Sequence, residues 1–260
     1  MYRLPLAAYR VLDLGPTAAV AYAARLLADA GAEVIAVERG TAARPPAGRH
    51  GSALFQQLNR NKLGCALDFA STRGAALLQR LVARCDVVIE GLDAPERERL
   101  ALTYDTLRAA RPDVIVASVR GAGGSVSTPL DIAAGTAGAA AVCAALLRHR
   151  DRGEGQHVEV DAHDCALSFQ GVTAAQVPAH DGVSSDVRLR EHRFLEPVAH
   201  RGGVEEMPAL PWRFSLTPCH VRLPAPEPGE HNRYVFGELL GLSEGDMADL
   251  EREGIIGAIS

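Results

Sequence analysis

The chain has 260 residues, of which 47% are hydrophobic and 23% are charged, and its formal net charge is −5 at pH 7. This composition is typical of a globular protein with a substantial core and argues against a disordered chain. Basic residues are scattered among acidic ones and form no stripe, so we expect no nucleic-acid partner. The N-terminal stretch lacks the basic region and long apolar run of a secretory signal, which predicts a cytoplasmic protein.

Apolar runs and cysteines narrow the class further. The longest apolar run, Ala137–Leu147, has about 11 residues, whereas a membrane span needs roughly 20, so we expect no membrane segment. The five cysteines are widely spaced and contain no C-x-x-C pair. This spacing predicts reduced, buried thiols and neither a disulfide framework nor a zinc site, and we expect no bound metal.

The first half of the sequence alternates between strand and helix patterns. Arg10–Leu14 predicts a buried strand, Ala18–Ala30 has apolar residues at helical spacing, and Glu33–Glu38 predicts a second strand. Together they form a βαβ unit with parallel strands and a right-handed connection. The alternation continues with a strand at Cys65–Asp68, a helix at Thr72–Arg84, a strand at Asp86–Glu90, a helix at Glu96–Arg111 and a strand at Val114–Val119.

This alternation predicts an α/β fold with an open, mostly parallel, Rossmann-like sheet and helices on both faces. A Gly/Ser loop, Arg120–Pro129, leads into a long apolar helix that opens near Asp131, and a strand at His157–Val160 precedes a helix from Ala162. We expect residues 1–170 to form a large domain and residues 171–210 a reduced small lobe or excursion. Residues 211–260 would return to the large domain, with a strand-like pattern at Pro211–Leu223 and closing helices at Glu230–Leu240 and Ser243–Arg252.

The common nucleotide and hydrolase motifs are missing. The turn after the first strand has one glycine, Gly15, where a G-x-G-x-x-G fingerprint needs three to admit a pyrophosphate. Glu38 ends the second strand where a ribose-binding acid would stand, but without the fingerprint we expect no NAD. The sequence also contains no P-loop, no G-x-S-x-G elbow and no H-E-x-x-H motif.

Two sets of polar residues are candidates for chemistry. Asp131 opens a long apolar helix, where it would either cap the helix or present a carboxylate among backbone N–H groups. His157 and His163 lie near Asp161 and Asp164, with His180 and Asp181 further on. These histidines and carboxylates would serve either as an acid–base pair or as a helix cap beside a half-exposed imidazole.

Six stretches of the sequence also resemble a known family. They are RVLDL…LLADAGAEVIAVER at Arg10–Arg39, LNRNKLGCALDF at Leu58–Phe69, CDVVIE at Cys85–Glu90, YDTLRAARPDVIVASVRG at Tyr104–Gly121, AALLRHRDRGEGQHVEVDAHDCAL at Ala144–Leu167 and PGEHNRYVFGELLGLS at Pro228–Ser243. In this order they resemble the family III CoA-transferases, whose relatives include formyl-CoA transferases and α-methylacyl-CoA racemases.

The resemblance implies an enzyme that takes an acyl-CoA as substrate and moves CoA to another carboxylic acid. Asp131 falls on the family's nucleophilic aspartate, which forms a mixed anhydride and then an aspartyl-CoA thioester. N–H groups of Gly121, Gly123 and Gly124 would stabilise the oxyanion, with Gly121 also beside the CoA. Arg39 and Arg120 match basic positions that contact the CoA.

Three departures from the family pattern shape the expectations. Ala19-Val20-Ala21 stands where the family has an A-G-P turn, the loop between Val119 and Asp131 is shorter and contains no histidine, and the small domain is reduced. We therefore expect a homodimer that is not interlocked, or a heteromer with a full-length homologue. The alternative function is a non-catalytic or repurposed scaffold: a partner subunit, or an isomerase or cyclase in a biosynthetic pathway.

Overall fold

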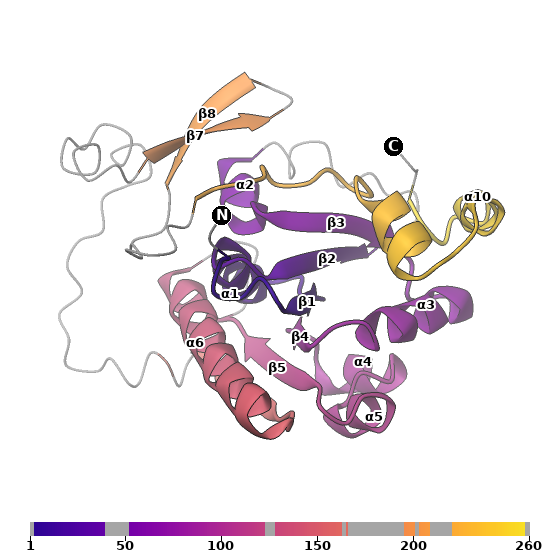
Figure 1. Ribbon diagram of the computed structural model, residues 1–260, viewed down its shortest axis with the longest axis horizontal. Coiled ribbons are helices and arrows are strands. Elements are labelled where there is room, and N and C mark those ends of the chain that lie inside the picture. Colours follow the sequence, from indigo (N-terminus) through magenta and orange to yellow (C-terminus); the bar gives the residue numbers. More distant parts are fainter. Residues whose placement is uncertain are drawn as a thin grey trace.

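A computed structural model of the chain describes residues 3–39, 52–122, 128–162, 165, 195–200, 203–208 and 220–257. Its centre is a six-stranded sheet in which every neighbouring pair is parallel, in the order β3-β2-β1-β4-β5-β6 (Figure 1). The strands are β1 (Arg10–Asp13), β2 (Glu33–Arg39), β3 (Lys62–Leu67), β4 (Val87–Glu90), β5 (Ile115–Arg120) and β6 (His157–Asp161). The predicted open parallel α/β fold is confirmed.

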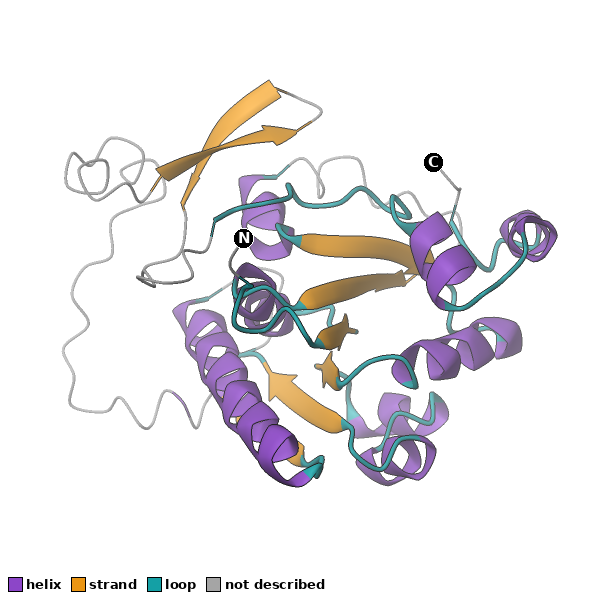
Figure 2. Ribbon diagram, viewed as in Figure 1, coloured by secondary structure: helices purple, strands orange, loops and turns teal. Residues whose placement is uncertain are grey.

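Helices cover both faces of this sheet (Figure 2). One face carries α1 (Ala18–Asp29) and α6 (Pro129–Arg152), whose small side chains share a core with Val11, Val34 and Val119. Glycine allows this close packing of α1 and α6, because a Cβ on Gly135 would lie only 2.6 Å from the carbonyl oxygen of Ala19. The other face is covered by α3 (Thr72–Val82), α4 (Ala94–Arg99), α5 (Tyr104–Ala110), the π-helix η1 (Arg233–Leu239) and α10 (Glu244–Arg252).

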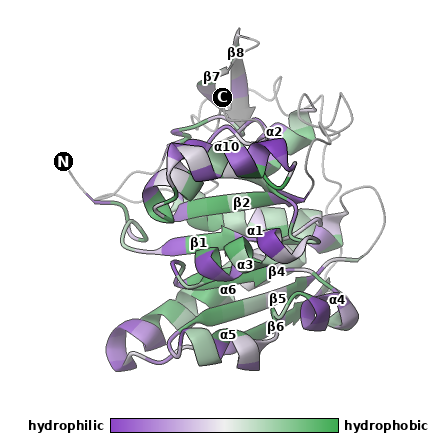
Figure 3. Ribbon diagram, turned by 90° about the vertical axis from the view of Figure 1, so that its right-hand side faces the viewer, coloured by the Kyte–Doolittle hydropathy of each residue, from purple (hydrophilic) through white to green (hydrophobic). Residues whose placement is uncertain are grey.

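Helix α6 is long and apolar enough, by length and composition, to cross a membrane, and 44% of its most apolar window is buried inside the fold. Ala134, Val142 and Leu146 of this helix belong to the core shared with α1 and the sheet. Packing against two neighbouring elements therefore accounts for its composition. Figure 3 shows that the strands of the sheet are also hydrophobic, because helices cover both faces of the sheet.

The prediction of one helix over Glu96–Arg111 is wrong, because the structure has two shorter helices there, α4 and α5. After α4, Ala101 adopts a left-handed backbone with φ of 53°, and the Thr103 hydroxyl caps α5 by accepting from the Thr106 N–H. Leu100 and Leu102 on either side of Ala101 are buried, so tertiary packing holds the break that the periodicity did not reveal. A further helix, α2 (Ala53–Asn59), was not predicted at all.

Several other predicted elements need adjustment. The closing helix Glu230–Leu240 is the π-helix η1, which begins at Arg233. Of the strand-like stretch Pro211–Leu223, only residues 220–223 are described, and they form no strand. Within the predicted small lobe, β7 (Leu195–His200) and β8 (Gly203–Pro208) pair as an antiparallel hairpin in a sheet of their own. The predicted division into three domain segments stays a prediction.

A buried lysine ties β3 to β1 and to helices α1 and α2. Lys62 is fully buried, and its ammonium group donates to Asp13 Oδ2 at 2.8 Å, the Ala21 carbonyl at 2.9 Å and Asn59 Oδ1 at 3.1 Å. Burial lowers the pKa of Lys62, and the Asp13 carboxylate opposes that shift. Three acceptors satisfy all three ammonium hydrogens, which is what allows a lysine to stand in the core.

Asn61 connects the segment around Arg222 to the start of β3 and to α1. Its side-chain oxygen accepts from the backbone N–H groups of Arg222 at 2.6 Å and Leu223 at 2.9 Å, and its amide donates to the buried Asp29 at 2.5 Å. Its φ of 63° lies in the left-handed region, which asparagine tolerates better than most residues. Near the C-terminus, Ile256 forms an antiparallel bridge with Leu67 of β3.

Candidate functional site

Asp131 lies near the edge of the sheet where the parallel strands end, which is where open α/β sheets place their ligand sites. It is not the N-cap that its position in the sequence suggested. Thr128 caps α6, and Asp131 is the third helical residue of a capping box in which each side chain bonds the other residue's backbone N–H. The predicted helix start is therefore three residues too late, and the carboxylate caps from inside the first turn.

The Asp131 carboxylate is held on both oxygens. Oδ1 accepts from the Ala122 N–H at 2.9 Å, while Oδ2 accepts from the Thr128 N–H and the Thr128 hydroxyl, both at 2.8 Å. The residue is only 4% exposed. Three donors therefore fix the orientation of this buried carboxylate at the start of α6.

Gly121 leaves room for that carboxylate. A Cβ built on Gly121 would lie 2.4 Å from Asp131 Oδ1, so any side chain there would displace it. The structure thus brings together two of the predicted site residues, Gly121 and Asp131, through the turn that follows β5. The other two glycines, Gly123 and Gly124, lie outside the described residues.

Arg39 lies at the end of β2, and its guanidinium pairs with a carboxylate of α4. It forms an ion pair with Glu96 of α4 at 2.5 Å and lies 5.3 Å from the centre of the Phe69 ring. Glu96 also accepts from Arg99 at 3.4 Å, so one carboxylate serves two arginines. The Arg39 side chain is half-exposed at 51%, which leaves it accessible to an anion in solution.

Arg120 occupies the equivalent place at the end of β5. Its Nε donates to Asp161 Oδ2 at 3.1 Å, and its side chain is 52% exposed. Between β2 and β5 lie two strands, so the two arginines stand on strands about 14 Å apart, given a spacing of about 4.8 Å per strand. The edge therefore offers two separated cations, each already paired with a carboxylate.

Val20 lies at the point where the strand order reverses, between β1 and β4. It is fully buried. A Cβ on Gly15 would lie 2.1 Å from Val20 Cγ1, and a Cβ on Gly91 would lie 2.9 Å from Val20 Cγ2. The valine that replaces the glycine of the A-G-P turn thus occupies space between the ends of these two strands.

Sequence reasoning missed a buried glutamate at the same edge. Glu90 ends β4 with no exposed surface and accepts from the Leu92 N–H at 2.6 Å, from Arg97 at 3.3 Å and from the Ser118 hydroxyl. Ser118 also meets His157 Nε2 at 2.9 Å. Since Arg97 is on α4, this network anchors the helix that carries Glu96. An acidic residue closing an otherwise apolar strand was the signal available in the sequence.

The predicted imidazole and carboxylate pair is only partly described. His157 lies in the Glu90 network and stacks on Tyr104 with ring centres 5.5 Å apart, and Asp161 pairs with Arg120. His163, Asp164, His180 and Asp181 lie outside the described residues. Within the described part of the chain, no three histidine, cysteine, aspartate or glutamate side chains gather as metal ligands would.

Comparison with known proteins agrees with the predicted family. The family model of CoA-transferase family III matches residues 6–129 and 124–183. The chain is 32% identical over 235 residues to a succinyl-CoA:mesaconate CoA-transferase of Haloarcula hispanica, covering 72% of this chain and 59% of that one. It is 30% identical over 216 residues to a succinate–glutarate CoA-transferase of Agrobacterium fabrum, covering 65% and 54%. The chain thus spans less than two thirds of these relatives.

Solved structures share the fold. A Mycobacterium tuberculosis protein has a TM-score of 0.75 at 21% identity, with 88% of this chain and 98% of that one covered. A CAIB/BAIF family protein from Brucella suis also has a TM-score of 0.75, at 18% identity, with 92% and 100% covered. With the family model matching more than half of the sequence, the chain belongs to CoA-transferase family III.

Proposed function

We propose that this protein moves CoA between carboxylic acids, with Asp131 as the nucleophile. The observation that carries the proposal is the buried Asp131 carboxylate, held by three donors at the start of α6 and packed against Gly121, whose lack of a Cβ admits Oδ1. Curated relatives are named as CoA-transferases that use succinyl-CoA, which supports a carboxylic-acid donor and acceptor.

The chemistry follows from a carboxylate in that position. Oδ1 of Asp131 attacks the thioester carbon, the C–S bond breaks, and CoA thiolate leaves an acyl-aspartyl anhydride behind. The thiolate then attacks the aspartyl carbon, releasing the donor acid and forming an aspartyl-CoA thioester. An acceptor carboxylate repeats the exchange in reverse and restores Asp131. The Thr128 N–H and hydroxyl, which already donate to Oδ2, are placed to stabilise the oxyanion that forms there when the thiolate adds to the aspartyl carbon.

The two edge arginines would hold the anionic parts of the substrate. CoA carries phosphates, and an arginine fork matches phosphate and carboxylate oxygens alike. Arg120 ends the strand that leads into Gly121 and Asp131, whereas Arg39 ends β2, three strands away in the sheet. An extended substrate would therefore reach from Arg39 across the edge to Asp131. Glu96 and Asp161 must release their arginines for this to happen.

The test of the nucleophile is covalent trapping. The protein is incubated with succinyl-CoA and hydroxylamine, and the intact mass is then measured for an adduct. Wild type should form an adduct that maps to the peptide carrying Asp131, and Asp131→Ala should form none. Asp105→Ala, which removes an exposed carboxylate on α5, should behave as wild type. Equal behaviour of wild type and Asp131→Ala would show that Asp131 is not the nucleophile.

A second candidate, a repurposed scaffold or partner subunit, is favoured by Val20. Its side chain packs against Gly15 and Gly91 at the switch point, and one similar chain, from Chloroflexus aurantiacus, is named as an alpha subunit. Calorimetry with free CoA separates the two. Binding by wild type supports the transferase; binding only after Val20→Gly, or only with a full-length homologue present, supports the scaffold.

The assembly proposed from the sequence is a homodimer that is not interlocked, with a heteromer as the alternative. Light scattering of the purified chain should give twice the mass of one chain. A stable monomer across concentrations would contradict the homodimer and direct the search to a second type of chain.

A further inference from the structure

The C-terminal segment, residues 220–257, lies along the outer edge of β3, which is the last strand on its side of the sheet. An outer strand presents backbone N–H and C=O groups that have no neighbouring strand to pair with. Beside the first residue of β3, the Asn61 N–H donates to the Leu223 carbonyl at 3.0 Å, and beyond its last residue the Asp68 N–H donates to the Ile255 carbonyl at 2.8 Å. Backbone hydrogen bonds therefore close both ends of this edge.

Between these ends, two side chains supply the acceptors. The Gly64 N–H donates to Nδ1 of His231 at 3.2 Å, and the His231 N–H donates back to the Gly64 carbonyl at 3.0 Å. The Ala66 N–H donates to Oδ1 of Asn232 at 3.1 Å. Gly64 and Ala66 are buried, so their N–H groups depend on these acceptors, because an unpaired buried N–H group destabilises a fold.

The acceptor that His231 provides differs from the others because it can take up a proton. A backbone N–H can only donate, so Nδ1 must carry a lone pair and the ring proton must be on Nε2. A protonated imidazole has N–H groups on both nitrogens, and its Nδ1–H would face the Gly64 N–H. Protonation of the ring therefore removes this hydrogen bond, whereas the amide of Asn232 does not titrate.

The surroundings of His231 favour the neutral ring. Burial lowers its pKa, and the Glu230 carboxylate opposes that shift. Glu230 itself accepts from the Glu227 N–H at 2.7 Å. On the β3 side, the Lys62 ammonium donates to acceptors of β1, α1 and α2. In the part of the chain that the structure describes, Glu230 is therefore the charged group that acts on this imidazole.

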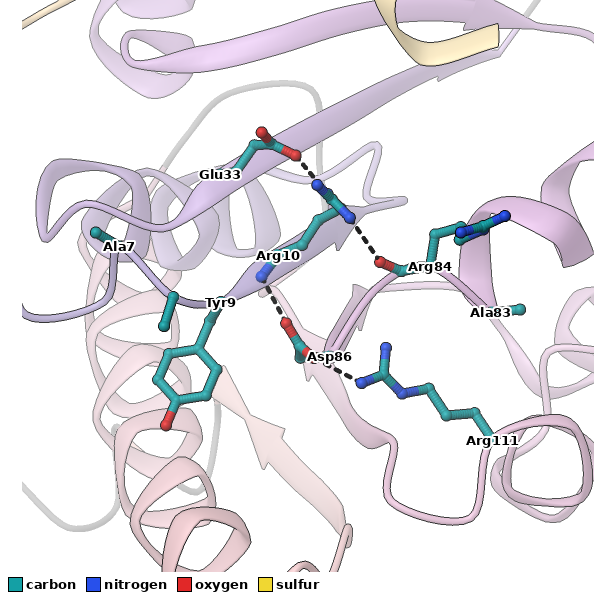
Figure 4. A pocket seen from close by; sticks show the side chains of 9 residues that line it. Ala7, Tyr9, Arg10, Glu33, Ala83, Arg84, Asp86 and Arg111 are labelled. Carbon is teal, nitrogen blue, oxygen red and sulfur yellow. Dashed lines mark hydrogen bonds and ion pairs between the residues drawn. The ribbon is translucent and has the colours of Figure 1, made fainter. Parts of the chain in front are cut away.

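Helix η1, the next element of the segment, has anchors of its own. The Tyr234 hydroxyl donates to Glu33 at the start of β2, at 2.8 Å, and Glu33 points toward Arg10, with which it pairs (Figure 4). Phe236 of η1 is fully buried in the core. Loss of the bond to Gly64 would therefore loosen the edge of β3 while η1 keeps its place in the core.

We propose that His231 is a pH-sensitive clasp: its neutral imidazole closes the outer edge of β3, and its protonation in mildly acidic solution opens that edge at Gly64. The sign of the effect follows from linkage. The fold disfavours the charged ring, so the clasp contributes its full stability above the pKa of histidine in the unfolded chain, about 6.5, and loses it as the pH falls below that value.

Amide hydrogen exchange of the full chain, measured by NMR at about pH 7.5 and about pH 5.5 and corrected for the intrinsic effect of pH, tests the clasp. Protection of the Gly64 amide should fall about fivefold at the lower pH, as expected for the loss of one ordinary hydrogen bond. In His231→Asn, whose side-chain oxygen accepts without titrating, protection of Gly64 should be the same at both pH values. An equal fall in wild type and His231→Asn would overturn the proposal.

Thermal unfolding gives a second readout, with His220→Asn as the matched control. His220 belongs to the same segment, but its Nδ1 contacts the Glu196 carboxylate, at 3.1 Å. Between the two pH values the unfolding midpoint should fall further in wild type and in His220→Asn than in His231→Asn, by about 2 °C or more. Falls of equal size in all three proteins contradict the clasp.

Nitrogen NMR of the wild-type imidazole keeps the test decisive even if His231→Asn does not fold. An Nε2–H ring with a bare Nδ1 at about pH 7.5 supports the clasp, and a proton on Nδ1 at that pH overturns it. These measurements need no CoA, so their outcome is independent of the proposed function.

Discussion

Asp131 shows how one residue can serve stability and chemistry together. Its backbone N–H and carboxylate complete the capping box with Thr128, and the same carboxylate faces the space left by Gly121. Capping orients the carboxylate at the start of the helix. The two interpretations of Asp131 that the sequence left open are therefore compatible.

Because Glu96 pairs with Arg39, we predict that Glu96 competes with CoA for the Arg39 guanidinium. Glu96→Gln should strengthen CoA binding up to about fivefold, because an exposed pair is worth at most about 1 kcal/mol. Calorimetry measures the change. Glu98→Gln, which removes the same charge from the same helix, is the control. An equal gain in CoA affinity in both variants would mean that the total negative charge of α4, and not the Arg39–Glu96 pair, sets the affinity for CoA.

Asp113 predicts a specific pH dependence of stability. Hydrogen bonds from His149 and Arg111 lower the pKa of its carboxyl to about 2. A carboxyl whose folded-state pKa is below its unfolded value stabilises the fold above the unfolded pKa, and this contribution is lost as the pH falls through the folded one. The difference in unfolding midpoint between wild type and Asp113→Asn should therefore narrow between pH 4 and pH 2. A difference for Asp113→Asn that stays constant over this pH range would contradict the assignment.

At the scale of elements, the first turn of α6 decides where the proposed nucleophile lies. Thr128→Ala removes both the hydroxyl that accepts from the Asp131 N–H and a donor to Asp131 Oδ2. We expect a loss of about 1 kcal/mol in the free energy of unfolding, together with slower CoA transfer. Denaturant unfolding and a transfer assay measure the two effects.

Thr128→Ser keeps the hydroxyl and is the matched variant, so it should restore both properties. A Thr128→Ala protein that loses stability but transfers CoA at the wild-type rate would show that the cap does not position the carboxylate.

The break between α4 and α5 illustrates what periodicity misses. A continuous helix satisfies the local pattern of apolar residues from Glu96 to Arg111. The fold instead buries Leu100 and Leu102 on either side of the left-handed Ala101 and starts α5 at a new cap. This break places Glu96 beside Arg39 and Arg97 beside Glu90. The position of α4 therefore affects the end of the strands where the ligand is proposed to bind.

At the scale of the whole molecule, Asn61 holds the C-terminal segment to the sheet. Asn61→Gly keeps the left-handed backbone but removes the acceptor for two N–H groups, which should cost about 1–3 kcal/mol of unfolding free energy. Asn61→Ala should cost more, because alanine adds the strain of a positive φ, about 1–2 kcal/mol. Denaturant unfolding measures both variants. Equal losses in the two would show that φ at this position carries no cost.

The sequence by itself determined the α/β class, the order of the six strands along the chain and the family, because hydrophobic periodicity and ordered motifs are local properties of the text. It also indicated Asp131, Arg39, Arg120 and Gly121 as candidates, whose roles stay predictions. Tertiary structure decided what these residues contact: Arg39 pairs with Glu96, Arg120 pairs with Asp161, and Asp131 joins the Thr128 cap. It also placed Val20 against Gly15 and Gly91 at the switch point. Those contacts join segments distant in the sequence, and their geometry depends on side-chain packing that no local pattern records.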